Sequence, residues 1–290
     1  MKLLVKFNLV LFLVFAVGLV TTGLVCSRLL QQNAKAEIME NARIMMEAAI
    51  AVRTYTATEI KPLLETQMKY SFLPQSVPAY SANAYFSQLQ KKFPDYSYRE
   101  ATLNPTNPVN RATDWESDII EDFRKSHDRT ELVGERETPN GRTLYMARPM
   151  KVSSPACLTC HDTVEGAPKT MLERYGGANG FGWKLNDIVT AQIVSVPTQL
   201  AAKRAKGVFV TFMISLAAVF ALLVIAINAL LIFFVIRPVN RLSTMAANVS
   251  LGNSDIGEFP VEGKDEIAEL SQSFNRMGRS LVEAMKMLRA

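Results

Sequence analysis

Two uncharged apolar runs dominate the pattern of hydrophobic and polar positions along the chain. Residues 9–26 and residues 207–236 contain no charged side chain. A helix needs about 20 apolar residues to cross a bilayer, so each run is long enough to span a membrane. The first run also exceeds the apolar region of roughly 7–15 residues that is typical of a cleaved signal peptide. The pattern therefore predicts an uncleaved N-terminal anchor (1–30), a domain of residues 31–206, a second membrane helix (207–236) and a C-terminal segment (237–290).

Between the two runs, helical spacing gives way to strand-like alternation. Apolar residues recur at helical intervals over 33–64, which predicts a stalk that continues the first membrane helix. Turn-forming residues and the alternation of apolar with polar positions predict further helices and strands. The Asn140-Gly141 dipeptide is typical of a hairpin turn. We expect helices over 82–92 and 114–127, with Asp114 as N-cap of the second, and strands over 96–103, 131–137, 142–150 and 188–196. Helices combined with antiparallel strands predict an α+β fold.

The C-terminal segment has the pattern of a coiled coil. Apolar residues of its second helix are spaced alternately by three and four positions: Ile267, Leu270, Phe274, Met277, Leu281, Ala284 and Leu288. A shorter helix precedes it, with Val239, Leu242, Ala246 and Val249 at similar spacing, and Gly252, Gly257 and Phe259-Pro260-Val261 predict an extended connector. One protomer cannot bury such a seam alone, so the pattern predicts a homodimer.

The strongest chemical signal is the stretch Cys157-Leu158-Thr159-Cys160-His161. C-x-x-C-H is the attachment motif of c-type haem, in which each thiol forms a thioether with a porphyrin vinyl group and the histidine ligates the iron. A thioredoxin-like pair, a structural disulfide and half of a zinc site are the alternatives. The chain has 3 Cys and 2 His in all, so a second Cys/His pair for zinc is lacking. The motif predicts one covalent haem, with His161 as the proximal ligand.

Charge and compartment indicate the topology. Lys2 and Lys6 before the first run, and Arg237 and Arg241 after the second, favour the cytoplasmic side. Lys203, Arg204 and Lys206 weaken this argument. In bacteria, however, haem is attached covalently outside the cytoplasmic membrane. We therefore expect a two-pass protein of the bacterial inner membrane, with both termini cytoplasmic and the haem domain periplasmic.

The overall composition adds little beyond the membrane runs. Hydrophobic residues make up 49% of the chain and charged residues 20%, with a net charge of +5. The basic residues are spread along the chain without a basic-aromatic stripe, which argues against a nucleic-acid partner. Anionic lipid headgroups are the simpler partners of the charges beside the membrane.

Both folded segments resemble known families. Pro238, Asp265-Glu266-Ile267 and Phe274-Asn275-Arg276-Met277 resemble a HAMP domain, whose dimer is a helical bundle. The outer domain resembles the c-type haem-binding, PAS-like sensor domains first described as a bacterial domain of unknown function. The blocks that carry this resemblance are Arg53–Thr56 with Pro62–Leu64, Asn104–Pro108, Tyr145–Pro149, Cys157–His161, Tyr175-Gly176 and Gly180–Lys184. The resemblance implies a PAS-like fold, one haem, and a role in redox or gas sensing.

The distal side of the iron has no obvious ligand. Some members of the resembled family place a Cys thiolate of the N-terminal helical region there, but Cys26 does not align with that position and is more typical of a small apolar membrane residue. The other candidates are His127, Met46, Met45, Met68, Met146 and Met150. An open site that binds NO, CO or O₂ is the remaining alternative.

Four further side chains are candidates for the haem pocket. Arg53 and Arg148 are able to pair with haem propionates, because a guanidinium holds a carboxylate bidentately, although a structural role fits them equally. Tyr145 and Trp183 are able to pack on the porphyrin, with ordinary core packing as the alternative. The glycines at 176, 177, 180 and 182 would let the backbone approach the cofactor closely.

These features together predict a membrane-bound haem sensor. A change at the iron would pass down the second membrane helix and bias the HAMP bundle. The chain ends at Ala290, so we expect the output to come from a separate cytoplasmic partner such as a kinase. A membrane-anchored monohaem cytochrome for electron transfer is the alternative. We do not expect an enzyme, since no acid–base constellation supports peroxidase chemistry.

Overall fold

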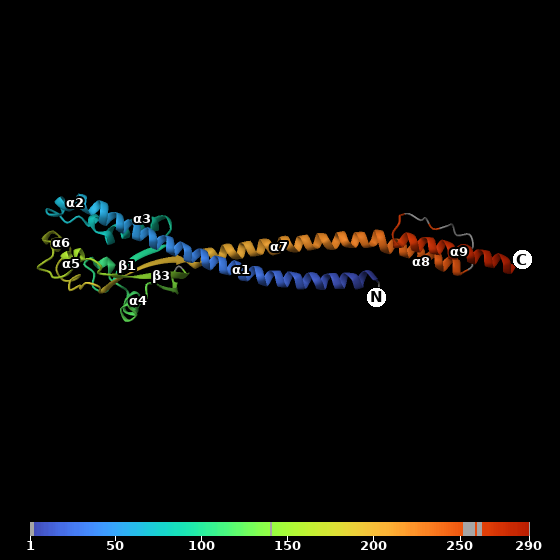
Figure 1. Cartoon of the computed structure of the whole chain (residues 1–290), viewed down its shortest axis with the longest axis horizontal. Helices are drawn as coiled ribbons and strands as arrows, with labels where there is room; N and C mark the ends of the chain where they lie inside the picture. Colours follow the sequence, from blue (N-terminus) through green and yellow to red (C-terminus); the bar gives the residue numbers. More distant parts are fainter. Residues whose placement is uncertain (1–2, 140, 252–258, 260–262, 290) are drawn as a thin grey trace. The chain divides into compact units, whose positions relative to one another are not determined.

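The computed structural model describes residues 3–139, 141–251, 259 and 263–289. By backbone contacts the chain divides into two units, one formed by Met1–Leu24 with Val210–Ala290 and one by Val25–Phe209. Figure 1 shows the elements of both units. Several residues that carry predictions lie outside the described ranges, namely Lys2, Asn140, Gly252, Gly257, Pro260 and Val261.

One long helix, α1 (Leu3–Tyr55), contains the first apolar run and most of the predicted stalk. It continues as a π-helix, η1 (Thr56–Ile60), and then as α2 (Lys61–Met68). No Gly or Pro occurs between residues 33 and 61, so nothing breaks the helix there. Pro62 lies in the first turn of α2, where a missing N–H is tolerated. The predicted stalk is confirmed.

The unit Val25–Phe209 is built on an antiparallel sheet of four strands in the order β1-β4-β3-β2. All four predicted strands are confirmed, and with them the mixed α+β character of the chain. Their bounds are β1 (Ser97–Thr102), β2 (Leu132–Thr138), β3 (Gly141–Lys151) and β4 (Ile188–Pro197).

The predicted hairpin joins β2 to β3. The two strands pair from Leu132 with Ala147 to Thr138 with Gly141. Gly141 has a φ of +104°, a backbone conformation that side chains rarely adopt. The hairpin is therefore confirmed, with Gly141 as the residue that needs the conformational freedom of glycine.

Helices cover both faces of the sheet (Figure 1). On the stalk face, α1 and α3 (Pro78–Lys92) bury one set of alternating strand residues. On the other face, α4 (Asp114–Lys125) buries the opposite set. The stalk-face core is Ile38, Ala42, Met45, Met46, Ala49, Ala82, Phe86, Tyr98, Leu144, Met146, Val194, Val196 and Ala201. The α4-face core is Ala101, Ile119, Ile120, Phe123, Ala147, Ile188, Ala191 and Ile193.

The start of α4 corrects one prediction. Thr113, not Asp114, is the N-cap of this helix, and Asp114 is its first residue. The carboxylate of Glu116 accepts hydrogen bonds from the Thr113 backbone N–H at 2.8 Å and from the Thr113 hydroxyl at 2.9 Å. A threonine followed three residues later by glutamate forms a capping box, and this pairing overrides the preference for aspartate at the cap.

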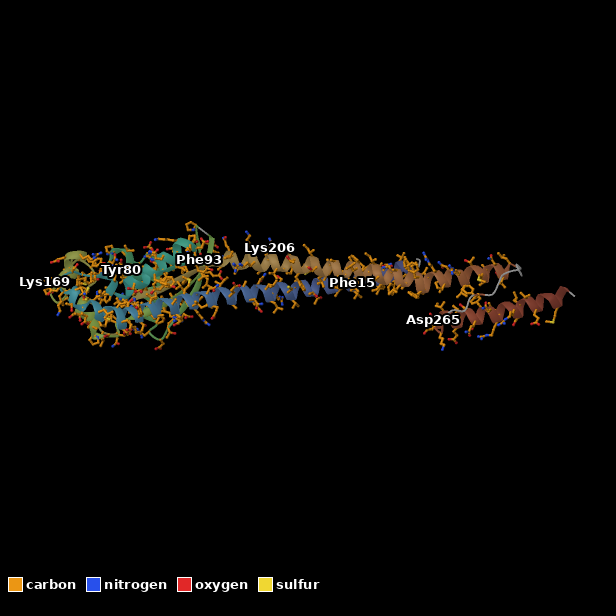
Figure 2. All side chains as sticks on the ribbon, turned by 90° about the horizontal axis from the view of Figure 1, so that it is seen from above. Phe15, Tyr80, Phe93, Lys169, Lys206 and Asp265 are labelled. Atoms are coloured by element: carbon orange, nitrogen blue, oxygen red, sulfur yellow. The ribbon has the colours of Figure 1, made fainter. Side chains whose placement is uncertain are left out.

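Short helices make up the rest of the Val25–Phe209 unit. The 3₁₀ turns are Pro74–Ser76 and Pro108–Asn110. The C-x-x-C-H stretch lies in a helix, α5 (Pro155–His161), and α6 (Lys169–Tyr175) follows it. Figure 2 labels Lys169 on α6 and Lys206 on α7 at opposite ends of this unit.

The second apolar run lies in α7 (Thr198–Leu230) and in a second π-helix, η4 (Leu231–Ile236). Between α1 and α7, the amides of Asn8 and Asn228 exchange two hydrogen bonds of 2.7 Å. The ring of Phe15 (Figure 2) stacks on Phe220 at 4.7 Å. Both helices are long and apolar enough to cross a membrane, and almost none of their apolar windows is buried.

Two helices form the C-terminal segment, α8 (Arg237–Ser250) and α9 (Glu266–Arg289). Asn275 of α9 accepts a hydrogen bond from the N–H of Phe259 at 2.8 Å and donates one to its carbonyl at 2.9 Å, which attaches the connector to the helix. Several residues of the predicted seam are exposed in the protomer, including Leu270, Met277 and Leu281. The side chain of Leu288 lies outside the described residues.

Thr113→Ala tests the capping box. The variant removes the hydroxyl at the N-cap, so we expect the free energy of unfolding to fall by about 1 kcal/mol. Urea denaturation of the full chain, followed by tryptophan fluorescence, measures this loss because Trp115 lies in the first turn of α4. Thr130→Ala is the control, since that exposed side chain forms no hydrogen bond within the described ranges. An equal loss in both variants would contradict the role of the box.

Candidate functional site

The short helix α5 gathers the three residues of the C-x-x-C-H motif. The Ser154 hydroxyl caps its start by accepting a hydrogen bond from the Ala156 N–H, and Pro155 occupies its first position. In a helix, residues three and four apart lie on the same side, so Cys160 and His161 project near Cys157. Both cysteines are free thiols and partly buried.

His161 is held by the segment that precedes β4. Its Nδ1 lies 2.8 Å from the carbonyl oxygen of Gly180 and 3.4 Å from the hydroxyl of Thr106. A carbonyl oxygen only accepts hydrogen bonds, so the proton of the neutral ring is on Nδ1 and the lone pair is on Nε2. This is the tautomer of a histidine that binds a metal through Nε2, with its other nitrogen oriented by a backbone carbonyl.

Trp183 packs directly against the same ring. The indole and imidazole centroids are 3.9 Å apart with their planes inclined by 12°. The backbone N–H of Trp183 also donates to the His161 carbonyl at 3.1 Å. The backbone N–H of Gly182 donates to the Asp162 carbonyl at 2.7 Å. Burial lowers the pKa of His161, although the hydrogen bond with Gly180 opposes this shift. The lowered pKa favours the neutral imidazole, which is the form that ligates a metal.

An apolar cluster surrounds Cys160. Its buried members are Phe72, Ala167 and Met171, with Met68, Val77, Cys160, Leu172, Tyr175 and Phe181 packed around them. Burial raises the pKa of the Cys160 thiol, and the nearby positive charge of Lys61 opposes this shift. The thiol thus faces an apolar environment that is bordered by a cation.

Large apolar side chains are exposed around the end of the stalk. Tyr55 is 57% exposed, Leu63 73% and Tyr70 84%. α2 ends beside α6, because the hydroxyl of Thr170 donates to the Met68 carbonyl at 3.1 Å. Two thiols on one helical turn, an oriented neutral imidazole and uncovered apolar surface fit a haem, whose porphyrin face is flat and apolar.

Two of the predicted pocket residues are engaged in ion pairs. Arg53 forms hydrogen bonds with both carboxylate oxygens of Glu100, at 2.6 and 2.5 Å. Arg148 pairs with Glu47 at 2.7 Å and with Glu131 at 3.0 Å. Their contacts with haem propionates stay predictions. Such contacts would require the propionates to share each guanidinium group with the glutamates that already pair with it.

Tyr145 and Trp183 differ in their surroundings. Trp183 contacts His161, as described, whereas Tyr145 lies on the α4 face of the sheet with its ring 5.4 Å from that of Trp115. A Cβ at Gly134 would lie 2.4 Å from the Tyr145 hydroxyl, so the glycine makes room for this ring. Packing of either aromatic ring on a porphyrin stays a prediction.

The predicted distal ligands are spread over the molecule. His127 is exposed just beyond the end of α4. Met45, Met46 and Met146 belong to the stalk-face core, and Met46 is completely buried. The sulfur of Met150 lies 3.2 Å from the Arg53 guanidinium. Cys26 lies in α1. None of these positions is tested as a ligand.

Met68 is the one predicted distal candidate that belongs to the cluster around Cys160. Its sulfur accepts a hydrogen bond from the Leu73 N–H at 3.1 Å and one from the Ser76 hydroxyl at 3.3 Å. These bonds occupy the lone pairs that a metal would need.

Sequence reasoning gave no role to Thr106 or Lys61, and it treated Gly180 only as one of four glycines that would let the backbone approach the cofactor. Thr106 and Gly180 lie in the blocks Asn104–Pro108 and Gly180–Lys184, which supported the family resemblance. A backbone carbonyl carries no side-chain signal, so its contact with His161 is visible only in the fold. The glycine itself was a signal, because its φ of +90° excludes most other residues.

Comparisons with known proteins bear out both resemblances. The family described as Tll0287-like matches residues 31–197, more than half of the chain, and the HAMP domain matches residues 230–283. A solved structure, "Crystal structure of the cyanobacterial heme-protein Tll0287", is similar at 15% identity and a TM-score of 0.44, covering 56% of this chain and 95% of that chain. Curated proteins gave no match.

Gly180→Ala tests the support of His161. A Cβ at this position would lie 2.0 Å from the Thr106 hydroxyl oxygen and 2.9 Å from its Cα, so the backbone must move. We expect the free energy of unfolding to fall by more than the ~1 kcal/mol that positive φ alone entails for alanine. Urea denaturation of the full chain provides the measurement.

Gly182→Ala is the matched control for this variant. Gly182 also has a positive φ, +78°, but a Cβ there meets no atom within 4 Å among the described residues. It therefore isolates backbone strain from the clash with Thr106. Equal destabilisation by the two substitutions would show that the close approach of Thr106 is unimportant.

Tyr98→Phe tests the buried network beneath the stalk. The Tyr98 hydroxyl donates to Glu100 at 2.7 Å and accepts from Gln192 at 2.9 Å. Burial, followed by the charge of Glu100, raises the pKa of Tyr98. A raised pKa means that the contribution to stability is complete below the unfolded value of about 10 and is lost as the pH rises further.

We expect the free energy of unfolding to fall less steeply above pH ~10 in Tyr98→Phe than in the unmodified chain. Urea denaturation at a series of pH values measures the slope. Tyr70→Phe serves as the control, because Tyr70 is 84% exposed. Parallel slopes for the unmodified chain and Tyr98→Phe would contradict the assignment.

Proposed function

Because the chain belongs to the Tll0287-like family and carries a HAMP domain, we propose that it is a membrane-bound c-type haem sensor. In this proposal a redox change or a diatomic gas at the iron is the signal, and HAMP relays it to a separate cytoplasmic partner such as a kinase. The single observation that carries the proposal is the orientation of His161, whose Nδ1 is fixed by the Gly180 carbonyl beside two free thiols.

Covalent attachment of one haem would use the sulfur atoms of Cys157 and Cys160. The bound group would supply an iron that changes oxidation state or binds a gas. The protein's own contribution is to present Nε2 of His161 as a neutral ligand and to cover the cofactor with apolar surface. Trp183 restricts rotation of the imidazole because the two rings stack at 3.9 Å.

A route from the site to the membrane helix follows from the connectivity. Trp183 contacts His161 through its indole ring and through its backbone N–H, and β4 begins five residues later at Ile188. The strand ends at Pro197 and α7 begins at the next residue. A displacement of the His161 ring would thus be transmitted along one rigid strand into the helix that leads to HAMP.

Location and assembly complete the proposal. We place the protein in the bacterial inner membrane as a two-pass protein with a PAS-like haem domain in the periplasm and both termini in the cytoplasm. The exposed seam residues of α9 support a homodimer, because a second copy would remove them from water. The HAMP domain, as a signal relay, supports a role as a sensor rather than as an enzyme.

The double variant Cys157→Ala, Cys160→Ala tests haem attachment. The unmodified protein, produced in bacteria with the c-type maturation machinery, should yield a c-type pyridine haemochrome spectrum with one haem per chain. The double variant should lose covalent haem, measured as loss of haem stain after denaturing electrophoresis, because both thioether positions are gone. Cys26→Ala is the control and should retain the full haem content.

A protein without covalent haem, or a Cys26→Ala variant that loses it, would contradict the proposal. Absorption and electron paramagnetic resonance spectra in both redox states, with and without NO, then identify the signal. Iron that binds NO supports gas sensing, and six-coordinate low-spin iron that is indifferent to NO supports redox sensing. Replacement of the HAMP segment that leaves the physiological response intact would favour an electron carrier over a sensor.

A further inference from the structure

A cavity of about 290 Å³ lies on the α4 face of the sheet, beneath the first turn of α4. Its size is just below the range of about 300–1,000 Å³ found for small-molecule sites, so it suits only a small ligand. The cavity is separate from the cluster around Cys160, which forms its own core. Its principal lining residues are Ser97, Arg99, Trp115, Arg136, Ile193 and Ser195.

Strand register explains why these residues meet. β1 and β4 pair antiparallel, with Ser97 opposite Ser195 and Arg99 opposite Ile193. Side chains alternate along a strand, so these four project to the same face of the sheet. Tyr98 and Glu100, the alternate residues of β1, point to the stalk face instead, and Glu100 pairs there with Arg53. The floor of the cavity is therefore fixed by the core on both faces.

Arg99 brings a positive charge to one wall. Its Nε lies 2.9 Å from a carboxylate oxygen of Glu116, yet the Nε hydrogen is buried and is not aligned for a hydrogen bond. The other carboxylate oxygen of Glu116 is occupied by Thr113. Glu116 thus neutralises Arg99 without fully satisfying its donors.

Arg136 adds a second guanidinium. It lies over the indole ring of Trp115, with its central carbon 4.0 Å from the ring centroid. Within the described part of the chain Arg136 forms no ion pair, whereas Arg142 on the neighbouring strand pairs with Glu135 and Glu137. Two guanidinium groups and one carboxylate leave the cavity with a net charge of +1.

We propose that this cavity binds a small organic carboxylate as a second input to the protein. A monoanion matches the net charge, and the guanidinium of Arg136 is preorganised on Trp115 to receive it. The hydroxyls of Ser97 and Ser195 are additional donors, while Ile193 and the indole ring provide apolar contact for the body of the ligand. An inorganic anion would leave these apolar walls unused.

The position of the cavity connects this ligand with the output. Ser195 lies near the end of β4, which finishes at Pro197, and α7 begins at Thr198. A ligand in the cavity would therefore contact β4 two residues before the strand ends and close to the start of α7. The same strand would receive the signal from His161, so the two ligands would act on one output element.

Isothermal titration of the full-length holoprotein with benzoate tests the site. We expect benzoate to bind with one site per chain and to change the fluorescence of Trp115, while the neutral isostere benzamide does not bind. Arg136→Gln should weaken benzoate binding by at least about tenfold, because a charge-assisted hydrogen bond is lost. Arg142→Gln, which removes an exposed arginine of β3, should bind benzoate like the unmodified protein.

Several outcomes would overturn the proposal. They are failure of benzoate to bind at millimolar concentration, equal binding of benzamide, equal effects of the two arginine variants, and binding of inorganic phosphate in preference to benzoate. An unchanged thermal unfolding midpoint in Arg136→Gln shows that its fold is intact. The double variant Cys157→Ala, Cys160→Ala should still bind benzoate, so failure of this site is distinguishable from failure of haem attachment.

Discussion

The hydrogen bond between Nδ1 of His161 and the carbonyl of Gly180 is the contact on which the proposed haem site depends. A metal-ligating imidazole must be neutral, must present one particular nitrogen and must keep its orientation. The 2.8 Å contact fixes the tautomer, burial lowers the pKa and so favours the neutral ring, and the stacked indole of Trp183 restrains its plane. Since Gly180 and Trp183 lie on the segment that leads into β4, the support of the proposed ligand is also the start of the proposed route to the membrane.

The stalk is attached to the sheet by a polar network as well as by apolar packing. Arg53 pairs with the buried carboxylate of Glu100, which also accepts a hydrogen bond from Tyr98, and Gln192 completes the chain of contacts. A buried ion pair gives little net stability, but removal of one partner is costly because the other charge is left without compensation. This network therefore specifies where α1 lies on the sheet more than it stabilises the fold. Arg53 precedes η1 by only three residues, so the π-helix begins next to this anchor.

Much of the architecture could be predicted because its causes are local. Period and alternation located the membrane helices, the stalk and all four strands, and the hairpin followed from a glycine that tolerates positive φ. The errors arose where neighbours compete. Asp114 has the right chemistry for an N-cap, but Thr113 takes that position and donates two hydrogen bonds to the Glu116 carboxylate. No helix was predicted over the C-x-x-C-H stretch, yet Ser154 caps one there and Pro155 begins it.

The sequence by itself determined the C-x-x-C-H motif on which the proposed cofactor rests, through two thiols and an imidazole within five residues, and the order of the elements, through hydrophobic period. Both depend on side chains that are close together in the sequence. Only the tertiary structure decided which backbone carbonyl orients His161 and which carboxylates form ion pairs with Arg53 and Arg148. It also decided which residues line the cavity under α4. The hydrogen bonds and ion pairs among these contacts join positions between 17 and 101 residues apart. No local pattern encodes them, because they arise from strand register and from the packing of helices on the two faces of the sheet.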